Sequence, residues 1–396
     1  MKKDRIKTLY LDANGSGPQV IKADTILRGV FGYTDGVTPP VWVRRFPSVA
    51  ELFAHLRQFY GYLSYVLDWR DAFCQEPELD VEVCNMNNLV HYGRCLLTVR
   101  NYDLVVVSPA AAGDDMTVLL KTARWLERRR GQLAILIGNE YELMDEKIDF
   151  IRTVGADIIC SQLSSAAAHY LYAECGQSRL MSLPPALNPT VYYPMPTMQR
   201  SIDIGFIGDI YWPFIGDKER TDLIRFFEAH GASFGLHCDI RTERIPRPDW
   251  AKFLNTCHSI IGAESGTYYL NDRCRLLTAA RNYNLNENRQ ATFEEVFERF
   301  YQGQLRVASG KTVSSRHFEP IGTKTCQILL EGDYQGMLKA HEHYISVKKD
   351  LSNIDEAIRQ FKDADYRQAI VERAYEHVMA QHTYHHRIQT LLQALS

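Results

Sequence analysis

The feature that most restricts the fold of this chain is an alternation of short apolar segments with longer segments of helical spacing. In the first half, each apolar segment is short and meets a turn signal at its C-terminal end. The intervening segments 115–130 and 145–155 place their apolar residues at helical intervals. The apolar segments are 79–85, 102–109, 132–140 and 156–162. This alternation predicts a parallel β-sheet wrapped by helices.

The same alternation restarts after a proline-rich segment. Residues 182–196 contain five prolines and show neither helical nor strand period, which is typical of a linker between domains. A strand-like segment at 201–208 and a helix-like segment at 218–231 follow. Because 396 residues exceed what one hydrophobic core usually serves, two doubly wound α/β domains are predicted. The predicted parts are an N-terminal Rossmann-like domain, 1–190, a C-terminal one, 191–375, and a final helix, 376–396, that packs back towards the N-terminal domain.

Composition excludes several classes of protein. The formal net charge of -3 provides no basic field for nucleic acid, so nucleic acid is not expected as a partner. No apolar run approaches the ~20 residues of a membrane span, and the N-terminus lacks the apolar stretch of a signal peptide. The nine cysteines form no CxxC pair and are interpreted as reduced thiols of a cytoplasmic protein. The sequence does not indicate an oligomeric state.

Polar residues at strand ends are the first candidates for a site, since open α/β sheets bind ligands at the carboxyl ends of their strands. Asn14, Gly15 and Ser16 follow the first predicted strand, and Asn139 and Glu140 follow the fourth. Glu140 is the candidate for an acceptor-activating base, although an ordinary exposed glutamate at a strand end fits the same pattern.

Two further candidates lie in the second half of the chain. Glu264 follows the strand-like segment 259–263 and is a candidate on the donor side. In the loop Gly205–Asp209, the glycines Gly205 and Gly208 allow the backbone to approach a phosphate closely. Simple turn geometry explains this loop equally well, because it lacks the third glycine of a dinucleotide-binding fingerprint.

The segment 311–332 holds the densest set of candidates. Arg316, His317 and Glu319 lie in a short predicted helix with Gly322 and Thr323 at its far end, ahead of a buried strand. The helix N-terminus can present its amides to a diphosphate while the carboxylate binds ribose hydroxyls. Alternatively, Glu319 is a first-turn residue placed favourably for the helix dipole.

This segment resembles the donor-site signature of the group-1 glycosyltransferases, especially their spore-maturation-protein-like branch. The resemblance covers about 200 residues, mostly in the C-terminal half. It implies the GT-B architecture, in which two Rossmann-like domains face each other across a cleft. It also implies a hexosyltransferase-like enzyme that transfers a sugar from a UDP or GDP donor to a sugar, glycan, lipid or protein. The matching residues are Ser314, Arg316, Phe318, Glu319, Gly322 and Thr323.

One position departs from the family pattern. Classical members of the larger group carry two glutamates separated by seven residues, and Lys311 stands where the first should be. The resemblance implies that Glu319 binds the ribose, which leaves open what polarises the sugar. Arg316, Lys311 and Arg220 are the cations expected to neutralise the diphosphate. The predicted catalytic residues are Glu140, Arg316 and Lys311, and the predicted nucleotide-sugar ligands are Gly208, Asp209, Arg220, Glu264, Ser315, Arg316, His317, Glu319, Gly322 and Thr323.

No metal and no cofactor besides the donor are expected, since a DxD motif in a suitable loop is missing. Retention of anomeric configuration is the outcome that the resemblance favours. Two alternatives remain open: a catalytically degenerate nucleotide-sugar-binding protein, and a GT-B nucleotide-sugar epimerase. The whole assignment depends on Glu319 reaching the nucleoside, and a side chain turned into the protein interior contradicts it.

Overall fold

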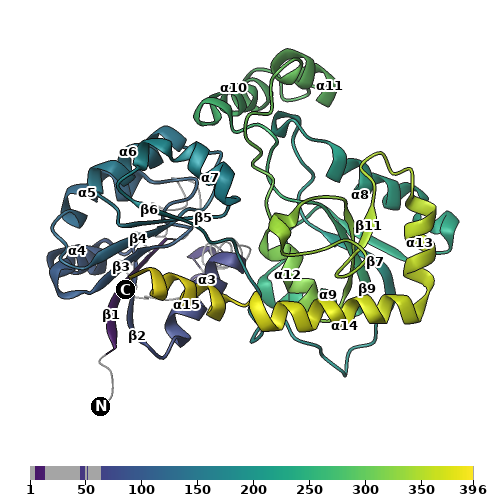
Figure 1. The fold of residues 1–396 in the computed structure, drawn as a ribbon, viewed down its shortest axis with the longest axis horizontal. Coiled ribbons are helices and arrows are strands. Elements are labelled where there is room, and N and C mark those ends of the chain that lie inside the picture. Colours follow the sequence, from purple (N-terminus) through teal and green to yellow (C-terminus); the bar gives the residue numbers. More distant parts are fainter. Residues whose placement is uncertain (1–4, 14–44, 50, 52–63, 396) are drawn as a thin grey trace. The chain divides into compact units, whose positions relative to one another are not determined.

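The computed structural model describes residues 5–13, 45–49, 51 and 64–395, which form two compact units (Figure 1). Unit 1 comprises Met1–Leu183 and Ile388–Ser396, and unit 2 comprises Pro184–Arg387. The division after Leu183 lies within the proline-rich segment 182–196, where a linker was predicted. The C-terminal residues that belong to unit 1 therefore begin at Ile388.

Unit 1 is built on a six-stranded parallel sheet with the order β2-β1-β3-β4-β5-β6. The strands are β1 Ile6–Asp12, β2 Leu79–Asn85, β3 Leu104–Val107, β4 Gln132–Leu136, β5 Ile158–Ser161 and β6 Arg179–Ser182. The central strands β3, β4 and β5 are almost wholly buried, which explains their continuous apolar sequences. Strand β6 was missed because it is an edge strand whose residues are exposed or half-buried, so its sequence carries no apolar run.

Polar caps and glycine define the ends of several unit 1 helices. Asn88 accepts a hydrogen bond from the His91 backbone N–H at the start of α4, and Ser164 does the same for Ala167 at the start of α7. Gly155 ends α6 with a positive φ of 56°. The helices are α3 Ser64–Gln75, α4 Leu89–Leu97, α5 Thr117–Leu126, α6 Met144–Val154 and α7 Ser165–Leu171, with short 3₁₀ helices at Val99–Asn101 and Ala173–Cys175.

Unit 2 has a five-stranded parallel sheet with the order β11-β10-β9-β7-β8. The strands are β7 Ile202–Ile207, β8 Cys238–Arg241, β9 Cys257–Gly262, β10 Cys326–Leu330 and β11 Ile345–Val347. The first strand, β7, pairs with β8 on one side and with β9 on the other. The strand order therefore reverses between β7 and β9, as it does between β1 and β3 in unit 1. The prediction of two doubly wound α/β domains is confirmed.

Helices cover both faces of the unit 2 sheet, while α10 and α11 lie away from it (Figure 1). The α-helices of unit 2 are α8 Glu219–His230, α9 Arg247–Thr256, α10 Arg275–Asn282, α11 Phe293–Val296, α12 Ser315–Gly322, α13 Ile354–Lys362 and α14 Ala364–Gln381. The last helix, α15 Tyr384–Leu395, begins in unit 2 and belongs to unit 1 from Ile388 onward. Shorter 3₁₀ and π segments lie at Pro213–Ile215, Gly231–Phe234, Asn271–Cys274, Tyr283–Glu287, Phe297–Tyr301 and Tyr334–Gly336.

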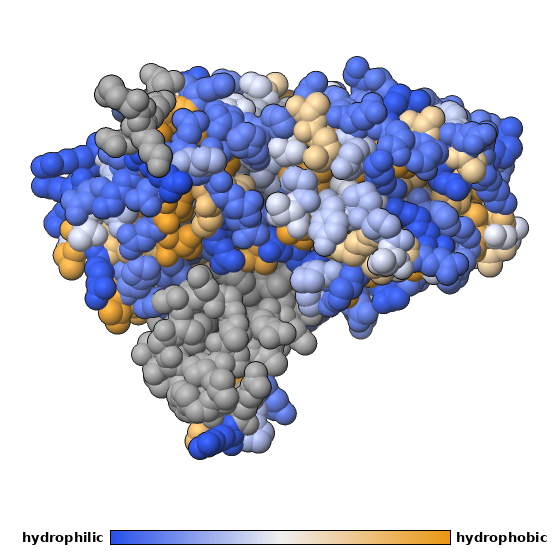
Figure 2. Space-filling view, turned by 90° about the horizontal axis from the view of Figure 1, so that it is seen from below, coloured by the Kyte–Doolittle hydropathy of each residue, from blue (hydrophilic) through white to orange (hydrophobic). Residues whose placement is uncertain are grey.

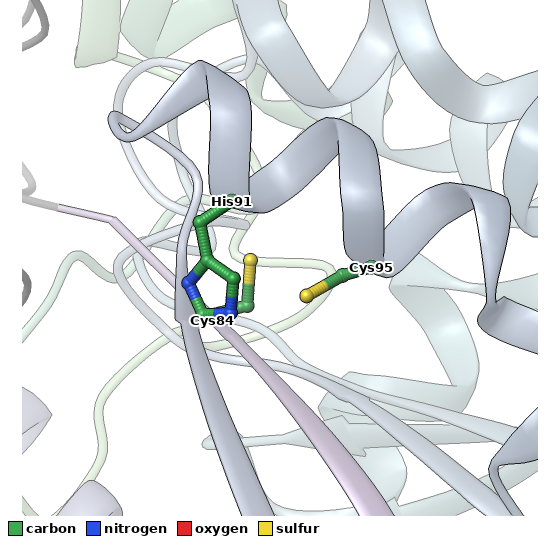
Figure 3. A group of neighbouring side chains, drawn as sticks. All are labelled: Cys84, His91 and Cys95. Atoms are coloured by element: carbon green, nitrogen blue, oxygen red, sulfur yellow. The ribbon is translucent and has the colours of Figure 1, made fainter. Parts of the chain in front are cut away.

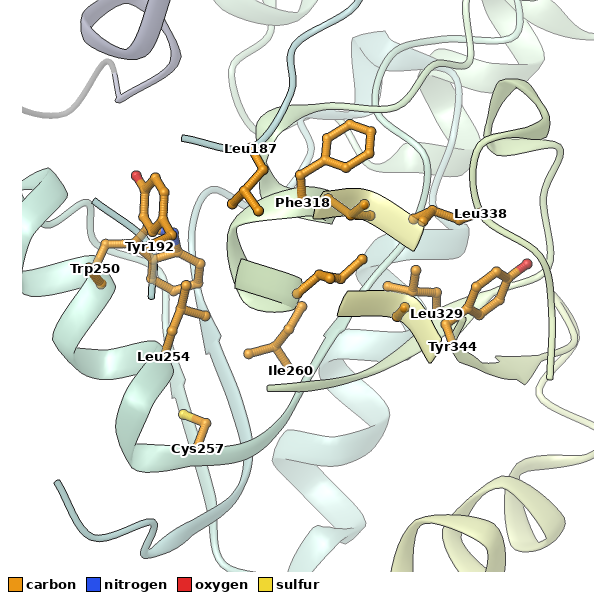
Figure 4. Packing of buried hydrophobic residues seen from close by; sticks show 14 of the residues in the cluster. Leu187, Tyr192, Trp250, Leu254, Cys257, Ile260, Phe318, Leu329, Leu338 and Tyr344 are labelled. Atoms are coloured by element: carbon orange, nitrogen blue, oxygen red, sulfur yellow. The ribbon is translucent and has the colours of Figure 1, made fainter. Parts of the chain in front are cut away.

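Strand alternation divides the core of unit 2 into two layers. Ile328 and Leu330 of β10 point to the face covered by α8 and α13, while Leu329 points to the face covered by α9, α12 and α14. Figure 4 shows the second layer, in which Phe318 of α12 and Trp250 of α9 pack over the sheet. Burying each such side chain contributes about 1.5–3 kcal/mol, so α12 is held firmly against the strands.

The surface seen in Figure 2 is largely hydrophilic, with apolar side chains in small separate groups. Among the described residues, no helix combines the length and the apolar composition needed to cross a bilayer.

Candidate functional site

The candidate site lies in unit 2 at the carboxyl ends of β7 and β9, where the strand order reverses. The N-terminal turn of α12 spans both strand ends. Arg316 donates from Nη1 to the carbonyl of Ile207 at the end of β7 (2.8 Å). His317 bonds through Nε2 to the carbonyl of Ala263, just beyond β9 (3.0 Å). In open α/β sheets, this reversal point is where ligands bind.

His317 fixes the start of α12. The backbone N–H of Ser314 donates to its Nδ1 (2.9 Å), so the ring proton lies on Nε2 and is donated to Ala263. Burial lowers the pKa of His317 to about 4, which keeps the ring neutral. The prediction that His317 and Ser315 contact the ligand is not supported, because both side chains are buried and His317 uses both nitrogens within the protein.

Arg316 is the most prominent cation of the site. Its guanidinium lies over the Trp250 ring (4.1 Å to the centroid), and 38% of its side chain remains exposed. Burial is the main cause that lowers its pKa; Glu319 opposes that shift, and the charges of Arg220 and Arg244 reinforce it. Three arginines thus share one region, and a guanidinium keeps its charge in proteins.

Arg220 lies in the first turn of α8, close to the end of β7. Its guanidinium stacks on the Tyr211 ring (4.6 Å to the centroid). A Cβ placed on Gly208 would lie 3.7 Å from Arg220 Nη2, so the predicted loop and the predicted cation are neighbours. Among the described residues, Arg220 forms no ion pair. A half-buried cation without a carboxylate partner is suited to bind an anion.

Asp209 and Glu264 occupy the rim of the same sheet edge. Asp209 accepts a hydrogen bond from Arg244 Nε through Oδ2 (2.9 Å), so it orients a cation of the group. Glu264 accepts from the Tyr334 backbone N–H (2.8 Å), and burial raises its pKa. A Cβ on Gly332 would lie 2.5 Å from Glu264 Oε2, so a larger residue there would displace this carboxylate. Both acids remain predicted ligands, each with a partner already in place.

Glu319 does not have the position predicted for it. Its side chain is 0% exposed, and Oε2 accepts a hydrogen bond from Trp250 Nε1 (2.7 Å). The same oxygen lies 4.0 Å from Arg316 Nε. The expectation that this carboxylate grips the ribose is therefore corrected: Glu319 faces the protein interior, and the condition on which the sequence-based assignment depended is not met. There it holds the indole and the guanidinium that stack on each other, and so acts as a positioning residue for Arg316.

Lys311 also differs from its predicted role as a cation for the donor. Its ammonium forms an ion pair with Asp217, and both side chains are nearly inaccessible to solvent. It also lies over the Tyr268 ring, 4.6 Å from the centroid. Breaking a buried pair costs about 3–5 kcal/mol, so this lysine is committed to the fold.

Gly322 and Thr323 lie at the opposite end of α12 from the arginines, about 10 Å along the axis. A Cβ on Gly322 would lie 2.5 Å from Leu187 Cδ1, which shows that this glycine permits close packing of the chain. Thr323 is fully buried and donates to the Pro320 carbonyl (2.9 Å). This packing does not support the prediction that their side chains contact the donor.

Glu140 in unit 1 is a buried carboxylate and not an open base. Ser161 Oγ (2.6 Å) and Tyr172 OH (2.8 Å) donate to Oε1, and the Gln162 N–H donates to Oε2 (2.8 Å). Burial raises its pKa. The network ties the end of β4 to β5 and α7, so the predicted catalytic role is not supported. Asn14, Gly15 and Ser16 lie outside the described residues.

Sequence reasoning missed three members of the site. Tyr211 and Trp250 supply the rings on which Arg220 and Arg316 lie, and Arg244 adds the third cation. In the sequence, Trp250 resembles any other apolar residue of a helix. Arg244 lies in a polar loop between β8 and α9 and resembles an ordinary surface charge. No local pattern distinguishes these residues from ordinary core and surface positions.

The described geometry agrees with comparisons to known proteins. Residues 220–393 match a family model described as glycosyl transferase-like. An alpha-glucosyltransferase, solved in complex with UDP-glucose and DNA containing an abasic site, is similar over 99% of both chains, with a TM-score of 0.56 and 11% identity. Anabaena Alr3699/HepE in complex with UDP is similar over 98% of this chain and 99% of that one, with a TM-score of 0.50 and 11% identity. The sequence matches no curated protein.

These likenesses confirm the predicted GT-B fold for the chain. The family model matches residues 220–393, which include Arg220, Arg244 and Arg316. The spore-maturation-protein-like branch stays a prediction.

Proposed function

We propose that this protein is a glycosyltransferase whose nucleotide-sugar donor binds at the arginine group of unit 2. The observation that carries the proposal is Arg220, half-buried at the carboxyl edge of the sheet, beside Arg316, with no ion-pair partner among the described residues. The family-model match over residues 220–393 supports the reaction class. Two guanidinium groups and the N-terminus of α8 provide the charge that a diphosphate requires.

In the proposed reaction, the bond between the anomeric carbon and the diphosphate oxygen breaks, an acceptor hydroxyl bonds to that carbon, and the hydroxyl proton passes to the leaving diphosphate. Negative charge develops on the leaving diphosphate, and preorganised cations stabilise it most. We propose that Arg220 and Arg316 do this without a divalent metal, and that transfer proceeds with retention, as the resemblance implies. The proposed donor is a UDP- or GDP-sugar.

The acceptor is proposed to be a sugar, glycan, lipid or protein hydroxyl. The alpha-glucosyltransferase with a similar structure was solved in complex with DNA, which concerns that protein and not the acceptor of this chain. The net charge of -3 of the present chain favours no polyanionic acceptor.

Calorimetric titration with UDP, GDP and their glucose derivatives tests the donor site. Replacing Arg220 with alanine is expected to weaken binding about 10–100-fold, since a hydrogen bond to a charged group contributes about 1.5–3 kcal/mol. Arg225→Ala is the matched control, because Arg225 lies on the same helix, is exposed and pairs with Glu228. Absence of binding by every nucleotide, or equal effects of the two substitutions, contradicts the proposal.

One observation favours a second candidate, a protein that binds the donor without turning it over. Lys311 stands at the position of the first signature glutamate and is locked in an ion pair with Asp217. This candidate predicts affinity for a nucleotide-sugar with no product from a panel of acceptors. Sustained transfer that Arg316→Ala abolishes rules it out. Incubation of the donor alone, followed by a search for its C2 epimer, tests the epimerase alternative.

A further inference from the structure

A cluster of soft metal-binding groups lies in unit 1, at the edge of its sheet. Cys84 is the penultimate residue of strand β2, and His91 and Cys95 lie on the helix that follows, α4. One ligand atom from each of the three lies within 4.8 Å of the others, and Figure 3 shows the two sulfur atoms and the ring turned towards one another. Among the residues that the structure describes, these three are the group of at least three histidine, cysteine or acidic residues whose ligand atoms all lie within 4.8 Å of one another.

Local structure explains why these side chains converge. His91 and Cys95 are four residues apart on α4, which puts them on the same face of the helix. The cap at Asn88, which accepts from the His91 N–H (3.2 Å), fixes where this helix begins. Only three residues separate β2 from α4, so the strand end and the helix face meet closely.

Glu82 supplies a fourth group. It precedes Cys84 by two residues, so both side chains leave β2 on the same side. Glu82 Oε1 lies 3.2 Å from His91 Nε2 and 3.6 Å from Cys95 Sγ. Its other oxygen accepts a hydrogen bond from the Tyr102 hydroxyl, which orients the carboxylate.

These separations match the edges of a tetrahedral zinc site. With Zn–O and Zn–N bonds of about 2.0–2.1 Å and Zn–S bonds of about 2.3 Å, neighbouring O and N ligands lie about 3.3 Å apart, and O and S about 3.5 Å. The observed 3.2 Å and 3.6 Å agree with these values. Two thiolates and an imidazole select zinc over magnesium or calcium, which prefer oxygen ligands alone.

We propose that unit 1 binds one zinc ion through Cys84, His91 and Cys95, with Glu82 as the fourth ligand and Tyr102 orienting Glu82. Four protein ligands make this a closed, structural site. The ion ties β2, an edge strand, to α4, and its ligands are separate from the arginine group of unit 2. Its occupancy can therefore be tested independently of the proposed transferase activity.

Metal content of the purified full chain, measured after exposure to zinc and removal of unbound ions, tests the site. We expect one zinc per chain in the wild type and little in Cys84→Ser and Cys95→Ser. Cys74→Ser and His169→Ala are the matched controls in unit 1, since Cys74 and His169 are exposed and lie outside the cluster. Glu82→Gln is expected to weaken zinc binding about 10–100-fold.

Two measurements on the wild type keep the test decisive if a serine variant fails to fold. X-ray absorption at the zinc edge is expected to show two sulfur ligands, and a chelator is expected to lower the melting temperature. Absence of retained zinc overturns the proposal. So does a Cys84–Cys95 disulfide, seen as thiols that label only after reduction, or zinc retention by the serine variants equal to that of Cys74→Ser.

Discussion

The two units share a strand order, but the side chains at the point where this order reverses carry opposite charges. In unit 2, the ends of β7 and β9 lie under α12 and beside Arg220, Arg244 and Arg316. In unit 1, the corresponding strands β1 and β3 end at a buried acid: Asp12 Oδ1 accepts from Ser108 Oγ (3.0 Å) and from the Ala13 N–H (2.9 Å). The fold offers a binding position in each unit. The side chains decide that the one in unit 2 attracts an anion.

Replacing Arg316 with alanine is the change with the largest expected effect. It removes a positive charge from the proposed diphosphate site, and loss of one preorganised transition-state donor costs about 10²–10³ in kcat. Initial rates of product formation from a UDP-sugar measure it. Arg241→Ala is the control, because Arg241 ends β8 at the same sheet edge and is exposed and paired with Asp239. Equal rates for wild type and Arg316→Ala would contradict the proposal that Arg316 stabilises the diphosphate in unit 2.

Acid is expected to destabilise unit 2 more than unit 1. Burial lowers the pKa of His317 to about 4, so between its ordinary pKa of about 6.5 and that value only the unfolded state takes up the proton. This stability is present above about pH 6.5 and is lost as the pH falls towards 4, in total about 3 kcal/mol. Burial raises the pKa of Glu140 in unit 1, so there the folded state takes up the proton first and gains stability as the pH falls.

Hydrogen exchange at pH 7 and pH 5, corrected for intrinsic rates, measures this difference. Peptides covering β10 should lose protection at pH 5, whereas peptides covering β4 should not. The loss should be smaller in His317→Gln and unchanged in His169→Gln, since His169 is exposed on α7. Greater loss of protection in β4 than in β10 contradicts the directions assigned to the pKa shifts of Glu140 and His317.

Glu319→Gln distinguishes a positioning acid from a ribose ligand. If Glu319 holds Trp250 and Arg316, Glu319→Gln and Trp250→Phe should each weaken donor binding by about 1–2 kcal/mol, and the double variant should be little worse than either. A 2′-deoxy donor should then bind the wild type nearly as well as the ribose form. The opposite outcome is that the wild type binds the 2′-deoxy donor more weakly than the ribose form, while Glu319→Gln binds both equally. That result would show that Glu319 contacts the ribose directly.

Glu140→Gln is expected to have the smallest effect. The amide oxygen can still accept from Ser161 and Tyr172, while the amide NH2 faces the Gln162 N–H, so one donor loses its acceptor. We therefore expect a loss of about 1 kcal/mol in the free energy of unfolding. Denaturant unfolding measures this, and transfer activity should stay near wild type. A general base contributes typically about 10²–10⁴-fold, so a comparable fall in kcat with stability unchanged would place Glu140 in the reaction after all.

The sequence alone determined the fold of the two units. Apolar runs and helical spacing predicted β2 to β5, β7 and α8, because a buried strand and an amphipathic helix each require a recurring local pattern. Strand β6 has no such pattern and was missed. The predicted helix that bears Glu319 is α12. The contacts of its first turn with the ends of β7 and β9 were not predicted.

Only the tertiary structure decided what each polar side chain does. Lys311 finds Asp217, a residue 94 positions away, and Glu319 finds Trp250, 69 positions away, so both are held in the interior. Arg220 finds no carboxylate among the described residues and stays available. A periodic pattern records which face of an element is buried, and it does so within a few residues of sequence. The partner of a buried charge comes from another element, so its identity depends on how distant segments pack.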